Sequence, residues 1–454
     1  MKQQFVSRED MPRLIMVFLG WAMDYRPYQN LRIKDYDILL IWDYRDDTFD
    51  LTDLDGYEEI IVIAWSFGVP VAARFIAANH SLPITSRVAV NGTQHPVDDE
   101  LGIPHALFDA TLDNLSETSL PRFYRRVAGS GSAFTSFMAS APIRDIEELR
   151  EELSVIALRT PATIFWDMAL IGSHDLIIPP DNQRRSWQKE AGRTVEISSP
   201  HQPDFGDVLS HVVTDKSLVA TRFGRAMSSY DGNAEVQHEV ARRLIDIWNP
   251  DENSTPRMIE IGCGTGYSTR LYLNRLKPGR LELWDLVISP SLPDNAVKVE
   301  CDAESRMFMT PPCSVDVIFT SSTVQWFNSL PAFFRNVKRV LASGGTLVMS
   351  TFGPENFAAL HAILGTTSGY PSVEEIKAML PDGLEVTHCT SESVSLPFPD
   401  PATMLRHISL TGVNALTRQS STAATRAILR EYPRQTNGTV LLTYSPIYFV
   451  IRKL

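Results

Sequence analysis

The sequence predicts two consecutive α/β domains, each built around a mainly parallel β-sheet. The chain has 454 residues, which is long for one domain and ample for two. Its first half contains short apolar runs separated by helical stretches, a pattern typical of parallel strands buried on both faces. Its second half contains an apolar run that ends in alternating glycines and leads into a helix. We place the boundary so that the domains span 1–212 and 213–454.

Composition excludes several classes of protein. The chain is 44% apolar and 21% charged, as globular proteins are, and its formal net charge of −12 disfavours nucleic-acid binding. The most apolar early run, Leu14–Met23, is about half as long as a membrane helix, so no membrane span is expected. The four cysteines form no C-x-x-C pair and no signal peptide is apparent. We therefore expect a cytoplasmic protein without a metal site.

Three apolar runs near the N-terminus are predicted strands of the first sheet. They are Leu14–Leu19, Asp37–Trp42 and Glu59–Ala64. The third leads into Trp65-Ser66-Phe67-Gly68 and a predicted helix, Val69–Ala78. A serine among small residues, in a turn from strand to helix, is typical of the nucleophile elbow of α/β-hydrolases, although Ala64 replaces the usual first glycine. Ser66 is therefore a candidate nucleophile, and an ordinary turn serine is the alternative.

A nucleophilic serine needs a base and an orienting acid, which in α/β-hydrolases follow it in the order acid, then histidine. Asp175 lies in a turn after one predicted strand, and His201 lies in the loop after the next. The expected triad is therefore Ser66, Asp175 and His201. His174 and His211 compete for the role of base, but neither lies in a loop directly after a final strand.

Two further features of the first half bear on the same candidate site. Gly20-Trp21 follows the first predicted strand, so the backbone N–H groups of Trp21 and Phe67 are candidates for an oxyanion hole. Leu101–Arg150 is predicted to be mainly helical and to form a cap. This cap carries three neighbouring arginines, Arg122, Arg125 and Arg126. They form either a solvated helix face or a docking patch for an acidic partner.

The second half is organised around Ile259–Gly266, which reads I-E-I-G-C-G-T-G and precedes a predicted helix, Tyr267–Leu276. Glycines at alternate positions allow a sharp turn and a close approach of a ligand to the backbone. The spacing differs from those of dinucleotide-binding and P-loop motifs. A carboxylate at Glu260 disfavours a phosphate ligand and suits a cationic or zwitterionic nucleoside. A glycine-rich turn without a ligand is the alternative.

Two acidic residues at predicted strand ends favour the ligand site. Asp285 ends the strand Leu281–Trp284, one strand–helix unit after the glycines, where an acid can accept hydrogen bonds from ribose hydroxyls. Asp302 ends the next predicted strand, Val297–Cys301. These three elements follow one another in the order that a doubly wound nucleoside site requires.

The glycine stretch resembles motif I of the S-adenosylmethionine methyltransferases. This resemblance implies a Rossmann-like class I methyltransferase fold with S-adenosyl-L-methionine as the cofactor, and it places Asp302 near the adenine amine. The cofactor-binding residues that it implies are Glu260, Gly262, Gly264, Gly266, Asp285, Asp302, Ala303 and Ser321.

The first half resembles the BioG type of pimeloyl-[acyl-carrier-protein] methyl ester esterase. The matching segments are Phe18–Asp24, the elbow Trp65–Gly68, Gly172–Asp175 and Ser199–His201. The resemblance spans most of 1–211 and implies an α/β-hydrolase fold with serine esterase activity.

The second half resembles the BioC type of malonyl-[acyl-carrier-protein] O-methyltransferase. The matching residues are Phe223, Arg225-Ala226, Tyr230, Gln237, Thr320–Trp326, Gly344–Pro354, Leu405–His407, Thr411–Ala415 and the expected closing strand Leu441–Tyr444. Ser322 stands where the family usually has asparagine. The substrate-side residues that the resemblance implies are Tyr230, Gln325, Trp326 and Arg406.

Together the two resemblances imply a fusion of two enzymes of biotin-precursor synthesis. One half would methylate the free carboxylate of malonyl-[acyl-carrier protein], and the other would hydrolyse pimeloyl-[acyl-carrier protein] methyl ester. The expected partner is an acyl carrier protein. Two alternatives stay open: a methyltransferase whose first half is an inactive docking module, and an O-methyltransferase acting on small molecules.

Overall fold

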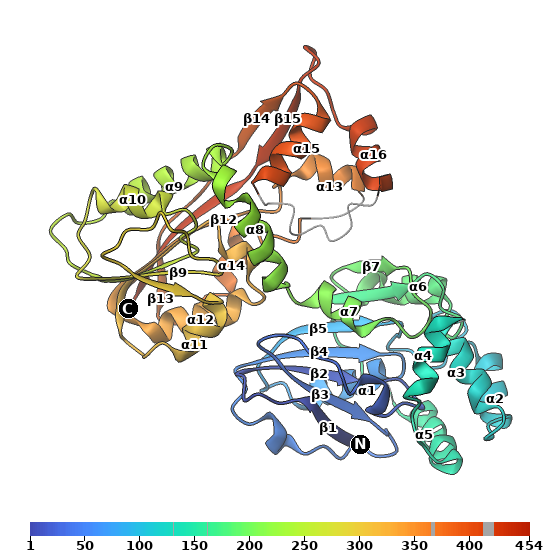
Figure 1. Ribbon diagram of the computed structural model, residues 1–454. Helices are drawn as coiled ribbons and strands as arrows, with labels where there is room; N and C mark the ends of the chain where they lie inside the picture. Colours follow the sequence, from blue (N-terminus) through green and yellow to red (C-terminus); the bar gives the residue numbers. More distant parts are fainter. Residues whose placement is uncertain (130, 161, 365–367, 412–421) are drawn as a thin grey trace. The chain divides into compact units, whose positions relative to one another are not determined.

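The computed structural model describes residues 1–129, 131–160, 162–364, 368–411 and 422–454. The chain divides into two compact units, Met1–Val213 and Thr214–Leu454. Each unit has its own seven-stranded sheet and its own apolar core (Figure 1).

The sheet of the first unit has the strand order β1-β3-β2-β4-β5-β6-β7. Its strands are β1 (Lys2–Ser7), β2 (Arg13–Phe18), β3 (Asp37–Trp42), β4 (Glu59–Trp65), β5 (Ile84–Val90), β6 (Met168–Gly172) and β7 (Thr194–Ile197). All neighbours pair in parallel except β1, which is antiparallel to β3. Strands β2, β3 and β4 are buried along their whole length, which explains their continuous apolar sequences. The sequence did not predict β1, because this half-exposed edge strand is mostly polar.

The helices of the first unit confirm the predicted helical cap. Between β5 and β6 the chain forms α2 (His105–Asp113), α3 (Leu120–Ala128), α4 (Ser132–Ala139) and α5 (Ile146–Leu158). Figure 1 shows these four helices gathered to one side of the strands. The other helices are α1 (Gly68–Ala78), α6 (Pro180–Glu190) and α7 (Phe205–Val212), with short 3₁₀ helices at Arg26–Tyr28 and Leu51–Leu54.

The sheet of the second unit has the strand order β10-β9-β8-β11-β12-β16-β13. Its strands are β8 (Arg257–Ile261), β9 (Arg280–Asp285), β10 (Val297–Glu300), β11 (Val315–Ser321), β12 (Leu341–Phe352), β13 (Leu384–Ser391) and β16 (Pro446–Lys453). The first five in spatial order are parallel, and β16 is antiparallel to both of its neighbours. Strand β8, which carries the glycine loop, lies near the centre, where the strand order reverses direction.

The expected closing strand was wrong. Residues 441–444 belong to β15 (Val440–Tyr444), which pairs with β14 (Val394–Phe398) in a separate two-stranded sheet. The last strand of the main sheet along the chain is β16, which lies between β12 and the edge strand β13. Beside the small sheet lie α13 (Ala358–Leu364), α15 (Pro401–Leu410) and α16 (Thr422–Glu431), as Figure 1 shows.

The remaining helices of the second unit flank the parallel strands. They are α8 (Lys216–Tyr230), α9 (Glu235–Trp248), α10 (Tyr267–Leu273), α11 (Ala303–Met309), α12 (Leu330–Val340) and α14 (Val373–Ala378), with a 3₁₀ turn at Val324–Trp326. Helix α10 ends three residues before the predicted Leu276. Within the described residues, no group of side chains could hold a metal ion, and no helix is long and apolar enough to cross a membrane.

Candidate functional sites

The turn after β4 holds Ser66 in the conformation of a nucleophile elbow. Ser66 has a φ of +57°, which is uncommon for a residue other than glycine and marks backbone strain at a functional position. A Cβ atom on Gly68 would lie 2.3 Å from the carbonyl oxygen of Phe18, so only glycine fits there. Gly20 is similarly close to the serine, because a Cβ on it would lie 3.2 Å from Ser66 Cβ. Small neighbours therefore permit the tight turn.

The three residues of the expected triad meet at this turn. His201 Nε2 lies 2.9 Å from Ser66 Oγ, and His201 Nδ1 lies 2.8 Å from Asp175 Oδ2. All three side chains are buried, and the two distances are within hydrogen-bonding range. His174, one of the competing histidines, is exposed and faces Ser173 instead. The geometry permits His201 to act as a base towards Ser66 while Asp175 orients it.

Two residues that sequence reasoning missed hold the acid and the histidine in place. Gln183 donates from Nε2 to Asp175 Oδ2 at 2.9 Å. Asn91 donates to the carbonyl oxygen of His201 at 2.8 Å and accepts from the N–H of Gly172 at 2.6 Å. Neither residue lies in a recognisable motif, so only the folded contacts identify these roles.

The residues expected to supply the oxyanion donors line the same pocket as Ser66 and His201. Trp21 and Phe67 line the pocket with Ser66 and His201, and within the described chain no acceptor bonds the backbone N–H of Trp21 or of Phe67. Unpaired donors beside a nucleophile are suited to a developing oxyanion. Cap helices and neighbouring loops supply the apolar wall, whose members include Met23, Ile103, Leu107, Phe108, Phe123, Val127 and Leu153. This pocket suits an uncharged acyl chain.

In the second unit the three glycines of the predicted loop all have positive φ values. Gly262, Gly264 and Gly266 have φ values of +73°, +52° and +82°. At Gly262 a Cβ would also lie 2.0 Å from Thr323 Oγ1, so the loop packs closely against the turn after β11. The N–H of Gly264 donates to Asp285 Oδ2 at 2.8 Å.

One pocket brings together most of the expected cofactor residues. Among the predicted positions, those that line it are Tyr230, Gly262, Gly264, Asp285, Asp302, Ala303, Ser321 and Trp326. Asp285 also accepts from the N–H of Val287 at 3.2 Å, and burial raises the pKa of its carboxyl. Asp302 caps the start of α11 by accepting from the N–H of Glu304 at 3.2 Å. Thus both strand-end acids reach the pocket of the glycine loop.

Glu260 does not line this pocket, so its expected role in cofactor binding has no support in the geometry. Its carboxylate accepts hydrogen bonds from Thr269 Oγ1 and from the hydroxyl of Tyr272, each at 2.6 Å. It is 2% exposed, and burial raises its pKa to about 7 despite these two bonds. Since β8 is buried on both faces, a side chain just before the glycines can point into the interior rather than towards the ligand.

Three other predicted residues also lie outside the pocket lining. Gly266 begins α10, behind the loop. Gln325 donates from Nε2 to the carbonyl oxygen of Ser322 at 2.6 Å, and Arg406 is exposed on α15. Ser322, which does line the pocket, has a φ of +53°, a conformation that asparagine adopts more readily than serine. Residues 412–415 of the expected substrate-side insert lie outside the described residues.

Helix α8 forms a wall of the pocket that the sequence did not predict. Its pocket-lining residues recur at helical spacing and are Lys216, Val219, Phe223, Met227 and Tyr230. Lys216 is 8% exposed and lies 2.8 Å from Glu304 Oε2 and 3.8 Å from Asp302 Oδ1. It also donates to the carbonyl oxygen of Trp326 at 2.7 Å. Other lining residues that sequence reasoning missed are Thr323, His238 and Cys301.

Family models match both units of the chain. A model described as "Pimeloyl-ACP methyl esterase BioG" matches residues 1–207, and a model described as "Methyltransferase domain" matches residues 259–349. The second unit is therefore a methyltransferase domain, whose cofactor is S-adenosylmethionine. The pocket residues fit this group, because two carboxylates and a glycine loop suit the hydroxyls and the cationic groups of such a nucleoside and would repel a phosphate.

Relatives match either nearly the whole chain or about half of it. The malonyl-[acyl-carrier protein] O-methyltransferase of Bacteroides fragilis (strain 638R) is 36% identical over 97% of this chain and 92% of its own length. The protein of that name from Bacteroides thetaiotaomicron is 34% identical over 53% of this chain and 98% of its own. The crystal structure of BioG from Haemophilus influenzae is 33% identical, covers 44% of this chain and 94% of that chain, and has a TM-score of 0.40. The chain therefore belongs to the family of the Bacteroides fragilis protein, with a BioG-type unit followed by a methyltransferase domain.

Proposed function

We propose that the chain is a bifunctional enzyme of biotin-precursor synthesis. Its second unit methylates the free carboxylate of malonyl-[acyl-carrier protein], and its first unit hydrolyses pimeloyl-[acyl-carrier protein] methyl ester to the free acid and methanol. The methyltransferase half is supported by full-length similarity to a relative of that name. The single observation that carries the esterase half is the hydrogen-bonded arrangement of Ser66, His201 and Asp175.

Methyl transfer to a carboxylate places modest demands on the protein. Bound S-adenosylmethionine supplies the methyl group. A free carboxylate is already ionised near neutral pH, so no side chain is needed as a general base. The chain must align the carboxylate oxygen with the methyl group and exclude water. Asp285 and the glycine loop would hold the nucleoside, while Tyr230 and Trp326, which line the same pocket, would face the substrate.

Ester hydrolysis uses the first pocket. His201 accepts the proton of Ser66 Oγ as that oxygen attacks the ester carbonyl, and then returns it to the departing methanol. Asp175 stabilises the imidazolium that forms. The N–H groups of Trp21 and Phe67 would stabilise the negative charge on the carbonyl oxygen. Water then releases the free acid by the same steps, with His201 again as the base.

Assays on the purified full-length chain test both halves. With S-adenosylmethionine we expect methylation of malonyl-[acyl-carrier protein] and little methylation of free malonyl-coenzyme A. We also expect release of methanol from pimeloyl-[acyl-carrier protein] methyl ester. Equal rates on malonyl-coenzyme A would favour a small-molecule O-methyltransferase. If the chain neither hydrolyses the ester nor becomes labelled at Ser66 by a fluorophosphonate, the first unit would be an inactive docking module.

A further inference from the structure

The loop that carries Trp21 is held by the cap. Its residues 19–24 follow β2, and Ala22 has a φ of +67°, which is strained for alanine. Trp21 Nε1 donates to the carbonyl oxygen of Leu149 in α5 at 3.0 Å. The hydroxyl of Tyr124 in α3 donates to the carbonyl oxygen of Ala22 at 3.1 Å. A strained loop keeps its shape only where the surrounding structure fixes it. Here the hydrogen bonds with two cap helices, α3 and α5, help to fix the loop.

Arg144, just before α5, makes a further contact of this kind. Its Nη1 donates to the carbonyl oxygen of Met23 at 3.0 Å, two residues after Trp21. The preceding N–H, of Ile143, donates to Asp24 Oδ2 at 2.9 Å. The segment that leads into α5 therefore binds two consecutive residues of the loop.

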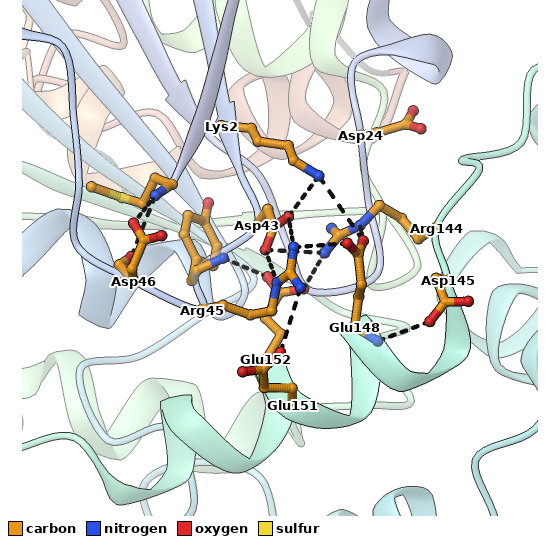
Figure 2. Close-up of polar contacts among 12 residues, drawn as sticks. Lys2, Asp24, Asp43, Arg45, Asp46, Arg144, Asp145, Glu148, Glu151 and Glu152 are labelled. Carbon is orange, nitrogen blue, oxygen red and sulfur yellow. Dashed lines mark hydrogen bonds and ion pairs between the residues drawn. The ribbon is translucent and has the colours of Figure 1, made fainter.

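The guanidinium of Arg144 is itself fixed by buried carboxylates. Its Nη2 lies 2.9 Å from Glu152 Oε2 and 3.4 Å from Asp43 Oδ1, and the side chain is 3% exposed (Figure 2). Glu152 Oε1 accepts from the N–H of Tyr44 at 2.9 Å, and the hydroxyl of Tyr44 donates to the carbonyl oxygen of Leu19 at 2.6 Å. The cluster thus reaches both ends of residues 19–24. Ion pairs this deeply buried are costly to break and hold their partners in one geometry.

The carboxylates of this cluster are paired with its own cations, and no catalytic residue takes part in these pairs. Burial alone would raise the pKa of Asp43, but hydrogen bonds from Arg45 and Lys2 outweigh it and hold that pKa well below its usual range. Burial raises the pKa of Glu152, although Arg144 opposes the shift. Figure 2 shows Arg45 and Lys2 approaching Asp43 beside Arg144.

We propose that Arg144 is a positioning residue for ester hydrolysis: it couples the cap to the loop that carries the Trp21 N–H and so sets the shape of the oxyanion hole. The inference rests on the proposed esterase function. An arginine suits this role because one planar group donates in two directions, to a carbonyl oxygen and to a carboxylate. Lysine has a single nitrogen on a differently shaped side chain, so it would keep either the contact with the Met23 carbonyl oxygen or the contact with the Glu152 carboxylate, but not both.

The test compares three variants of the full-length chain. Arg144→Lys keeps a cation beside Glu152, and the double variant Arg144→Met/Glu152→Gln removes both charges so that none is left unpaired. Arg45→Met is the matched control, because Arg45 also binds Asp43, at 2.8 Å, but its hydrogen bonds and ion pairs in the described chain go to Asp43, Glu148 and Glu151 rather than to residues 19–24. Hydrolysis of p-nitrophenyl butyrate is measured per active site, counted by fluorophosphonate titration. Loss of one oxyanion donor costs about 10²–10³-fold in kcat, so a misplaced donor should cost about 10-fold or more at nearly unchanged KM.

Hydrogen exchange of the amides in residues 19–24 gives a second readout that needs no catalysis. We expect faster exchange there in both Arg144 variants and parental exchange in Arg45→Met. Parental kcat per active site with parental exchange in the Arg144 variants would overturn the inference while the esterase function stands. A parent chain that hydrolyses no ester would instead overturn the proposed function, and exchange would then still show whether Arg144 holds the loop.

Discussion

Glu260 shows that a residue can belong to a motif while its side chain points away from the pocket that the motif forms. Its position before the glycines suggested a ligand, whereas its carboxylate binds Thr269 and Tyr272 in the interior. Asp285 and Asp302 both line the pocket of the glycine loop, because a residue at the carboxyl end of a parallel strand lies at the ligand edge of the sheet, and their role in cofactor binding stays a prediction. The direction of a side chain within a strand buried on both faces is set by packing, which no local pattern records.

The pKa of Glu260 predicts a pH dependence of stability. Burial raises this pKa from 4.5 to about 7. Between pH 4.5 and pH 7 Glu260 is therefore protonated in the folded state but ionised in the unfolded state. The contribution of Glu260 to the free energy of unfolding should therefore fall as the pH rises from 4.5 to 7, by about 3 kcal/mol. Urea unfolding of the full-length chain at pH 5 and pH 7.5 should show this fall in the parent and a smaller one in Glu260→Gln. An identical fall in both proteins would contradict the assignment.

Asp302 combines a cap with a contact to the pocket, and two substitutions separate these roles. Asp302→Asn keeps a side chain that caps α11 as well as aspartate does, whereas Asp302→Ala removes the cap. We expect both variants to weaken S-adenosylmethionine binding in calorimetry more than they lower the maximal rate of methyl transfer, because such contacts hold ground state and transition state alike. Only the alanine variant should also lose about 1 kcal/mol of stability. Parental cofactor affinity in both variants would exclude Asp302 from the cofactor site.

At the scale of elements, the sequence located the strands that carry the sites better than the elements that enclose them. Strands β2 to β4, β8 and β11 contain compact apolar runs, so their ends could be assigned. Strand β1 is polar and half-exposed, and β16 was confused with β15, because a short apolar strand does not reveal which sheet it joins. Residues of helix α8 match a family signature, but the sequence does not reveal that one face of this helix forms a wall of the pocket.

Helix α8 should therefore govern cofactor affinity through Lys216. Removing its ammonium in Lys216→Met leaves Glu304 and Asp302 without this cation and frees the carbonyl oxygen of Trp326. A hydrogen bond to a charged group contributes about 1.5–3 kcal/mol, so we expect the Kd for S-adenosylmethionine to rise about 10-fold or more. Arg225→Met, which removes a charge from the exposed side of the same helix, is the control and should bind normally. Equal affinities in the two variants would argue against α8 as a cofactor-binding wall.

At the scale of the whole molecule, two sheets with separate cores carry two sites that share no residue. The order of triad residues and the glycine loop could be read from the sequence because each lies at a strand end. The contacts of Gln183, Asn91 and Arg144 could not, because none of these residues lies in a recognisable motif, and Asn91 and Arg144 bind partners far away in the chain. A docking patch and a solvated helix face stay the two alternatives for Arg122, Arg125 and Arg126.

The central claim is that one chain carries two independent activities, and a reciprocal pair of variants tests it most directly. Ser66→Ala and Gly264→Val are each assayed for both reactions on carrier-protein substrates. Removing a triad nucleophile costs on the order of 10⁶ in turnover, so Ser66→Ala should abolish ester hydrolysis and retain methylation of malonyl-[acyl-carrier protein]. Gly264→Val places a β-branched residue at a φ of +52°, so it should abolish methylation and retain hydrolysis. Ester cleavage at the parental rate by Ser66→Ala would contradict the account.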